Sequence, residues 1–215
     1  MKRIFLPITA SALLLLTACG GGNETKKQES TDTEPICFYQ FTKNSTATVN
    51  WTAFKTTEKV GVGGTFNQVL VKGGDKSTKI TDIINGINFT IMTESTFTKD
   101  EGRDKKIIES FFGSMAATDL IIGHGKSAKG NNESGTAIFY LTMNDIEKEV
   151  SLDYTLNDNT ITLTGEIDVL DWSGGDAIAA LNSVCEDLHK GADGESKLWS
   201  VVELNIEASL DKNCN

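Results

Sequence analysis

Residues 118–171 alternate between apolar-patterned segments and short polar turns, and this rhythm constrains the fold more than any other feature of the chain. The turns consist of Gly, Asn and Asp, which favour tight chain reversals. Between the turns, apolar side chains recur at every second position, as they do in half-buried strands. The pattern predicts consecutive antiparallel strands at residues 118–129, 133–144, 146–157 and 160–171.

Further strands are expected on both sides of these hairpins. The candidates are residues 37–46, 47–57, 69–71, 87–92 and 202–210. We interpret the glycine cluster at residues 61–64 as a turn or tight bend that enters the strand at 69–71. About nine strand candidates without a βαβ rhythm predict an all-β, antiparallel barrel or sandwich.

The first of two predicted helices covers residues 102–112. Its apolar stripe has helical spacing and consists of Ile107, Ile108, Phe111 and Phe112. Lys105, Lys106 and Glu109 are expected in solvent, and Arg103 with Asp104 forms a polar hinge at the helix start. A helix of this kind is expected to cover one open end or flank of a barrel.

The second predicted helix covers residues 176–189, with Asp176 as its N-cap. Its expected buried stripe consists of Ile178, Leu181, Cys185 and Leu188. A single helical turn at residues 79–85, closed by Gly86, is also compatible with the sequence.

Residues 1–19 have the features of a bacterial lipoprotein signal peptide. Lys2 and Arg3 precede an apolar run that is too short to span a bilayer. The run ends in Leu-Thr-Ala-Cys, a lipobox in which Cys19 accepts the lipid and becomes the mature N-terminus. We therefore expect a lipid-anchored protein of the cell envelope, attached to a bacterial membrane through acylated Cys19 and facing the periplasm or the cell exterior.

Residues 20–35 contain no apolar side chain other than proline, which predicts a flexible tether. Residues 36–215 are long enough for one domain with a single core. The formal net charge of -10 becomes more negative when Lys2 and Arg3 are removed. An acidic surface repels phosphate backbones, so nucleic acid is not an expected partner.

Three cysteines remain for an oxidising compartment: Cys37, Cys185 and Cys214. They allow one disulfide and one free thiol. We favour the pair Cys37 and Cys214, because the first and last strands of a closed antiparallel barrel are neighbours. Cys185 lies on the apolar stripe of the second helix, and we interpret it as a buried small side chain.

The sequence offers little support for catalysis or metal binding. Gly123-His124-Gly125-Lys126-Ser127 lacks the spacing of a phosphate-binding loop. The only histidines, His124 and His189, lie far apart and have no suitably spaced acidic ligands. No nucleophile elbow occurs. We therefore expect no catalytic residues, no metal and no cofactor.

The chain resembles the YceI-like family of lipid- or polyisoprenoid-binding proteins. The resemblance rests on Trp-Thr-Ala-Phe-Lys at 51–55 leading to Val-Gly-Gly-Thr-Phe at 62–66, on Arg103-Asp104 before Phe111-Phe112, and on the order of the hairpins. It implies a lipocalin-like antiparallel barrel of about eight strands with two short helices. It also implies a hydrophobic tunnel for an isoprenoid chain in the periplasm, without catalysis.

On this basis we expect a long-chain isoprenoid or similar amphiphilic lipid as the bound ligand. The candidate tunnel-lining residues are Phe66, Phe89, Ile91, Phe97, Phe111, Phe112, Phe139, Leu141 and Leu163. The alternative is that these side chains fill a solid core. The domain would then be a structural or interaction module without a small-molecule ligand, and the loop at 190–197 would face its partner.

Overall fold

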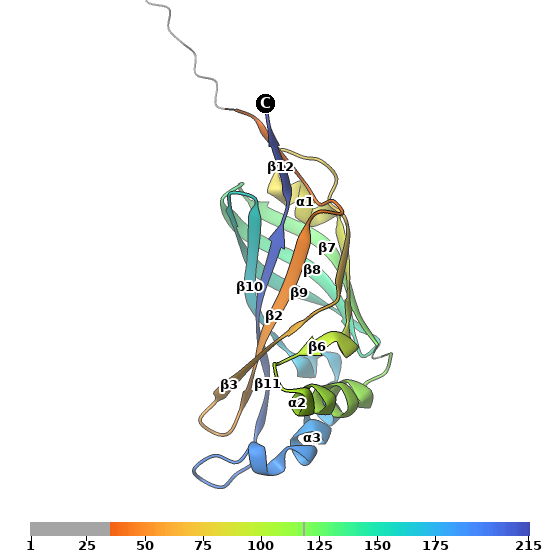
Figure 1. Ribbon diagram of the computed structural model, residues 1–215, viewed down its shortest axis with the longest axis vertical. Helices are drawn as coiled ribbons and strands as arrows, with labels where there is room; N and C mark the ends of the chain where they lie inside the picture. The colour runs from red at the N-terminus through yellow and green to blue at the C-terminus, as the bar shows by residue number, and fades with distance from the viewer. Residues whose placement is uncertain (1–34, 118) are drawn as a thin grey trace, which may run out of the picture. The chain divides into compact units, whose positions relative to one another are not determined.

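Ten strands form one antiparallel sheet that curls around an apolar interior (Figure 1). The computed structural model describes residues 35–117 and 119–215; the predicted signal peptide, Cys19, tether residues 20–34 and Thr118 lie outside the described residues. The strand order is β4-β5-β7-β8-β9-β10-β11-β2-β3-β6. Their bounds are β2 Thr46–Lys55, β3 Val60–Phe66, β4 Val69–Gly73, β5 Ile87–Met92, β6 Thr96–Phe97, β7 Leu120–Gly130, β8 Ser134–Met143, β9 Ile146–Asn157, β10 Thr160–Asp168 and β11 Leu198–Ser209.

The predicted all-β antiparallel barrel is confirmed, and so are the hairpins from β7 to β10. In these strands alternate side chains face inward, and the buried members of β9 are Val150, Leu152 and Tyr154. The expectation of about eight strands was too low. Short strands such as β6 were missed because two residues carry no readable alternation.

The glycine cluster at residues 61–64 was wrongly interpreted as a turn, because it lies inside β3. Gly64 pairs with Trp51 of β2, and a Cβ atom on Gly64 would lie 2.2 Å from the indole ring. The indole therefore lies over the bare backbone of the neighbouring strand. Here glycine marks a close approach between a large side chain and a strand.

A separate two-stranded sheet joins the ends of the domain. β1 Cys37–Gln40 pairs with β12 Asp211–Cys214, and Cys37 lies opposite Cys214. The two cysteines form a disulfide, as predicted. Cys185 is a free, buried thiol. Pro35–Asn215 form a compact unit with its own apolar core and disulfide.

Three α-helices accompany the sheet in the described residues, one more than the two predicted. α1, Ile80–Gly86, replaces the single turn that was compatible with residues 79–85. Figure 1 shows α1 near β12 at one end of the sheet, and α2, Glu101–Lys106, with α3, Gly175–Val184, at the other. Among residues 35–117 and 119–215, no helix combines the length and apolar character needed to cross a membrane.

The predicted helix at 102–112 consists of three different turns. α2 is followed by a π-helical turn, η2 Ile107–Phe111, and by the 3-10 turn η3 Phe112–Ser114. Asp100 is the N-cap, since its Oδ1 accepts a hydrogen bond from the Arg103 backbone N–H at 3.0 Å. Lys106 was expected in solvent but is half-buried, which the change of helix type immediately after it helps to explain.

The predicted helix at 176–189 starts and ends earlier than expected. The short helix η4, Val169–Trp172, leads to Gly174, which is the N-cap of α3, so Asp176 lies in the first turn and is not the cap. α3 stops at Val184, and the 3-10 turn η5 Glu186–Leu188 follows. This break shifts the helical period, and Leu188 is 60% exposed, not buried.

Candidate functional site

The inner face of β2 runs from an apolar end to a charged end of the domain. Strand alternation puts Ala47, Val49, Trp51, Ala53 and Lys55 on the same face. The neighbouring strand β11 repeats the apolar part with Ala208, Ile206, Leu204 and Val202. Three adjoining cavities follow this axis, and each is lined in part by β2 side chains.

The middle cavity has a volume of about 150 Å³ and an almost wholly apolar wall. We call it the apolar cavity. α3 contributes Ile178 and Leu181, and the remaining walls come from the sheet and from η2, η3 and η4. These walls are lined by Val49, Trp51, Ala53, Phe66, Ile91, Ile107, Phe111, Phe112, Ile121, Leu141, Met143, Ile167, Val169, Leu198, Trp199, Val202 and Leu204.

A smaller apolar cavity of about 70 Å³ lies toward α1. We call it the distal cavity. Val49 and Ile91 line both apolar spaces, so these two side chains form the partition between them. Ile83 and Ile84 of α1 contribute to the distal wall. A ligand's hydrocarbon chain that passes from one cavity into the other must displace the side chains of Val49 and Ile91.

On the opposite side the apolar cavity adjoins a third cavity of about 410 Å³, which we call the vestibule. Trp51, Ala53 and Ile107 line both of these spaces. The vestibule wall also carries charged and polar groups: Lys55, Asp100, Arg103, Lys106 and His189. An apolar space that adjoins a polar one suits a molecule with a tail and a head group.

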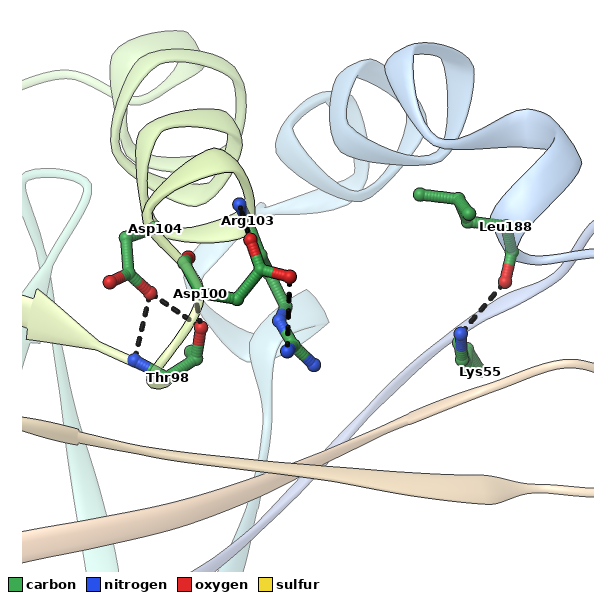
Figure 2. A network of polar contacts seen from close by, with 6 residues as sticks. All are labelled: Lys55, Thr98, Asp100, Arg103, Asp104 and Leu188. Atoms are coloured by element: carbon green, nitrogen blue, oxygen red, sulfur yellow. Dashed lines mark hydrogen bonds and ion pairs between the residues drawn. The ribbon is translucent and has the colours of Figure 1, made fainter.

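Figure 2 shows how two of the cations reach this region. The Arg103 side chain extends from α2 toward the strands, and Lys55 rises from β2 below Leu188. Lys55 Nζ donates a hydrogen bond to the Leu188 backbone oxygen at 2.9 Å. Arg103 Nη2 lies 3.7 Å from Asp100 Oδ2, and Asp104 accepts hydrogen bonds from Thr98. Asp104 therefore anchors the helix start, while Arg103 faces the vestibule.

His189 is a buried member of the vestibule wall, with 7% of its surface exposed. Its Nδ1 lies 2.8 Å from Asn182 Oδ1. Burial lowers the pKa of His189 below the ordinary value of 6.5, and the positive charges of Lys55 and Lys106 lower it further. The imidazole therefore stays neutral over a wider pH range than a free histidine.

Two buried donors at the vestibule have no hydrogen-bond partner among the described residues. They are Trp51 Nε1 and Arg103 Nε. Buried N–H groups are normally satisfied, because an unmet donor loses its hydration without compensation. Both side chains line the vestibule, and Trp51 also lines the apolar cavity.

The structure brings five of the nine candidate lining residues to the apolar cavity: Phe66, Ile91, Phe111, Phe112 and Leu141. Phe89 lines the distal cavity. Phe139 and Leu163 are packed in the core, with 4% and 6% of their surfaces exposed, and line none of the three spaces. Ligand contact by any of these residues stays a prediction.

Phe97 was expected in the interior, and this expectation is wrong. Its strand β6 pairs with β3 so that Phe97 lies beside Thr65, which in turn pairs with Asn50 of β2. This register puts Phe97 on the outer face, where 41% of its surface is exposed. It lines a shallow outer groove with Asn50 and Thr52.

The residues shared by the apolar cavity and the vestibule were not predicted as lining residues from the sequence. Trp51 and Ala53 are on the inner face of a predicted strand, and that alternation was the signal that could have identified them. No local pattern predicts that Lys55, Arg103 and Lys106 line one space, because they come from β2 and α2 and meet only in the folded domain. Within the described residues, no group of three or more His, Cys, Asp or Glu side chains could hold a metal ion.

Comparisons with known proteins agree with this architecture. Residues 39–210 match the family model of the YceI-like domain. A polyisoprenoid-binding domain from Saccharophagus degradans, implicated in plant cell wall breakdown, has a similar fold with a TM-score of 0.57 and 12% identity. The similarity covers 84% of this chain and 100% of that chain.

BcnA from Burkholderia cenocepacia also has a similar fold. Its TM-score is 0.55 at 14% identity, over 77% of this chain and 96% of that one. A comparison with curated protein sequences found no match. At such low identities the solved structures establish the shared fold.

Proposed function

The chain belongs to the YceI-like domain family, and from this membership and its apolar interior we propose that it binds one amphiphilic lipid without catalysing a reaction. The proposed ligand is an isoprenoid or a similar chain, a class supported by the polyisoprenoid-binding relative in fold. One observation carries the proposal: a nearly pure apolar cavity adjoins a vestibule with charged walls. Dehydration of the tail would drive binding.

The size of the apolar cavity limits how the tail is bound. Its volume of about 150 Å³ is comparable to that of an engineered cavity that accepts benzene, so about one isoprene unit fits without rearrangement. Each buried methylene contributes about 0.8 kcal/mol. The units nearest the head group would extend into the vestibule, and a longer tail would enter the distal cavity by moving Val49 and Ile91.

The proposal is tested by filling the apolar cavity. In Ala53→Phe an added ring takes the space that Trp51 and Ala53 border, and we expect loss of binding to the neutral fluorescent probe N-phenyl-1-naphthylamine. The domain 35–215 is used, and displacement by farnesol is measured for each protein. Thr48→Phe is the matched control, because it adds the same ring to an exposed position of β2.

Equal binding by wild type, Ala53→Phe and Thr48→Phe would contradict an interior site. Mass spectrometry of an organic extract of the purified domain provides a second measurement. Recovery of a stoichiometric lipid that is lost in Ala53→Phe would support the proposal. Absence of both probe binding and lipid would favour the alternative of an interaction module with a filled core.

We further propose that acylated Cys19 anchors the protein to a bacterial membrane, with the domain in the periplasm or outside the cell. The supporting observation is the lipobox at the end of the short apolar run. Metabolic labelling with palmitate is expected to mark the full chain, while Cys19→Ala abolishes the label. Labelling that persists in Cys19→Ala would refute this anchor.

A further inference from the structure

The vestibule gathers positive charge in a chain that is acidic as a whole. The formal net charge of the chain is -10, yet the charged residues of the vestibule wall are three cations and one carboxylate. The cations are Lys55, Arg103 and Lys106, and the carboxylate is Asp100. Among the described residues Asp100 pairs with Arg103, and neither lysine has an ion-pair partner. The vestibule wall therefore carries excess positive charge even when His189 is neutral.

The unpartnered donors lie on the same wall. Arg103 Nε and Trp51 Nε1 are buried, and both need an acceptor that no described residue provides. An oxygen-rich group in the vestibule could accept hydrogen bonds from the guanidinium of Arg103, whose side chain lines this space. Arginine suits an oxyanion because its planar array of N–H groups matches two oxygens at once.

We infer that the vestibule selects ligands whose head group is an oxyanion, a phosphate or a carboxylate, while the tail lies in the apolar cavity. This inference rests on the proposed function and names the ligand class for the same site. The ligand would be an acidic amphiphile, such as a prenyl phosphate or a fatty acid. A neutral alcohol with the same tail could accept a hydrogen bond but would leave the cations without a counter-charge.

The order of side chains along β2 gives the orientation of the ligand. Val49 marks the tail end, Trp51 and Ala53 border the apolar cavity and the vestibule, and Lys55 marks the head end. Arg103 and Lys106 reach the vestibule from α2, so the head group would lie between the sheet and this helix. The lowered pKa of His189 agrees with this geometry, since Lys55 and Lys106 both act on the imidazole.

The selectivity is tested with acid and alcohol pairs that share a tail. Farnesyl phosphate is compared with farnesol, and palmitate with hexadecanol, by displacement of N-phenyl-1-naphthylamine from the domain 35–215. We expect the acid to bind at least about tenfold more tightly than the alcohol in at least one pair, because hydrogen bonds to charged groups are the stronger kind. The pair that shows the preference distinguishes a phosphate from a carboxylate head.

Variants on α2 separate a local site from a general charge effect. Arg103→Gln should lower the preference for the acid about tenfold, and Lys106→Gln about threefold, while alcohol binding stays unchanged. Lys105→Gln is the matched control. It removes the same charge from the same helix, but its side chain is 70% exposed and pairs with Glu109 instead of lining the vestibule.

The outcomes distinguish failure of the inference from failure of the proposed function. Binding of alcohols and acids with equal affinity by the wild type would refute the oxyanion site and leave the lipid-binding proposal intact. An equal effect of Lys105→Gln and Lys106→Gln would also refute it, since only net charge would then matter. If no acid or alcohol displaces the probe, the proposed function fails as well.

Discussion

The two ends of the curled sheet are both covered by short helices, but only one end has substantial cavities beneath them. At the α1 end, Ile80, Ile83 and Ile84 are at most 1% exposed, and the cavity there is about 70 Å³. At the α2 and α3 end, α2 has no buried residue, and the adjoining cavities are about 150 and 410 Å³.

We call the α1 end the dense end. Its close packing is explained by direct contact between α1 and the backbone of the sheet. Gly125 of β7 lies against α1, where a Cβ atom would be 1.9 Å from the Ile84 backbone oxygen. Gly73 has φ +83°, and a Cβ atom there would be 2.1 Å from the Gly86 oxygen. Bare backbone at these positions lets α1 sit directly on the sheet. The π-helical turn after α2 instead presents Ile107 and Phe111 to the apolar cavity across open space.

The largest effect is expected from removing the disulfide at the dense end. Cys37→Ser with Cys214→Ser opens a link between residues 177 positions apart, and the chain-entropy model predicts a loss of about 5 kcal/mol in the free energy of unfolding. Urea unfolding measures this loss. Farnesol binding below the transition should be unchanged, because neither cysteine lines the vestibule or the apolar cavity.

A loss of less than about 2 kcal/mol in unfolding free energy would contradict this prediction. It would show that the stability of the α1 end does not depend on the disulfide. Cys185→Ala in the same assay is the control for loss of a cysteine that forms no disulfide.

The second prediction compares one isoleucine from each end. Ile83→Ala should cost about 3 kcal/mol of unfolding free energy, because a fully buried side chain leaves a cavity, while farnesol affinity stays the same. Ile107→Ala should cost about 1 kcal/mol, because Ile107 is half-buried, but it should change farnesol affinity severalfold. The reverse result would show that the α1 end holds the ligand and that η2 belongs to the packed core.

The third prediction concerns Phe111 of η2, which lines the apolar cavity. Phe111 is half-buried and packs edge-on against Phe112, with ring centroids 5.1 Å apart. Phe111→Ala should cost about 1 kcal/mol, less than a fully buried phenyl group, and should enlarge the cavity. We expect geranylgeraniol to gain affinity relative to farnesol, measured by probe displacement. An unchanged ratio would show that Phe111 does not limit tail length.

The smallest effect is expected from pH. Burial and the nearby Lys55 and Lys106 lower the pKa of His189, so below the ordinary value of 6.5 the unfolded chain binds this proton more readily than the folded one. Unfolding free energy should therefore fall as pH decreases from 6.5 toward the lower folded pKa. His189→Gln should flatten this part of a stability-against-pH curve, and a curve identical to wild type would contradict the assignment.

Much of the fold was predictable because it depends on local patterns. The strands β7 to β10 follow from period-two alternation and from turns such as Asn144-Asp145. The pairing of Cys37 with Cys214 was predicted from neighbouring end strands of a barrel, and the structure forms it in the separate sheet of β1 and β12. The glycines at 61–64 were wrongly predicted as a turn, because glycine occurs both in turns and where a side chain lies close to the backbone. Only the position of the Trp51 indole over Gly64 shows which of the two applies.

The candidate site was only partly predictable. Phe66 and Phe112 were expected in the interior and line the apolar cavity, since both lie on apolar faces of their elements. Phe97 was misplaced because two residues of strand carry no alternation, and its face depends on pairing with Thr65. Whether these phenyl groups contact a ligand is left to the binding experiments above.

The amino-acid sequence alone determined the family, the antiparallel sheet and the pair of cysteines that joins the two ends of the domain, because hydrophobic period and residue type act over a few neighbouring positions. Tertiary structure alone decided where the interior is filled and where it is hollow. That outcome depends on how closely each helix approaches the sheet. The tertiary structure also brings Lys55 of β2 together with Arg103 and Lys106 of α2 around the vestibule. No local sequence pattern encodes this meeting of distant segments.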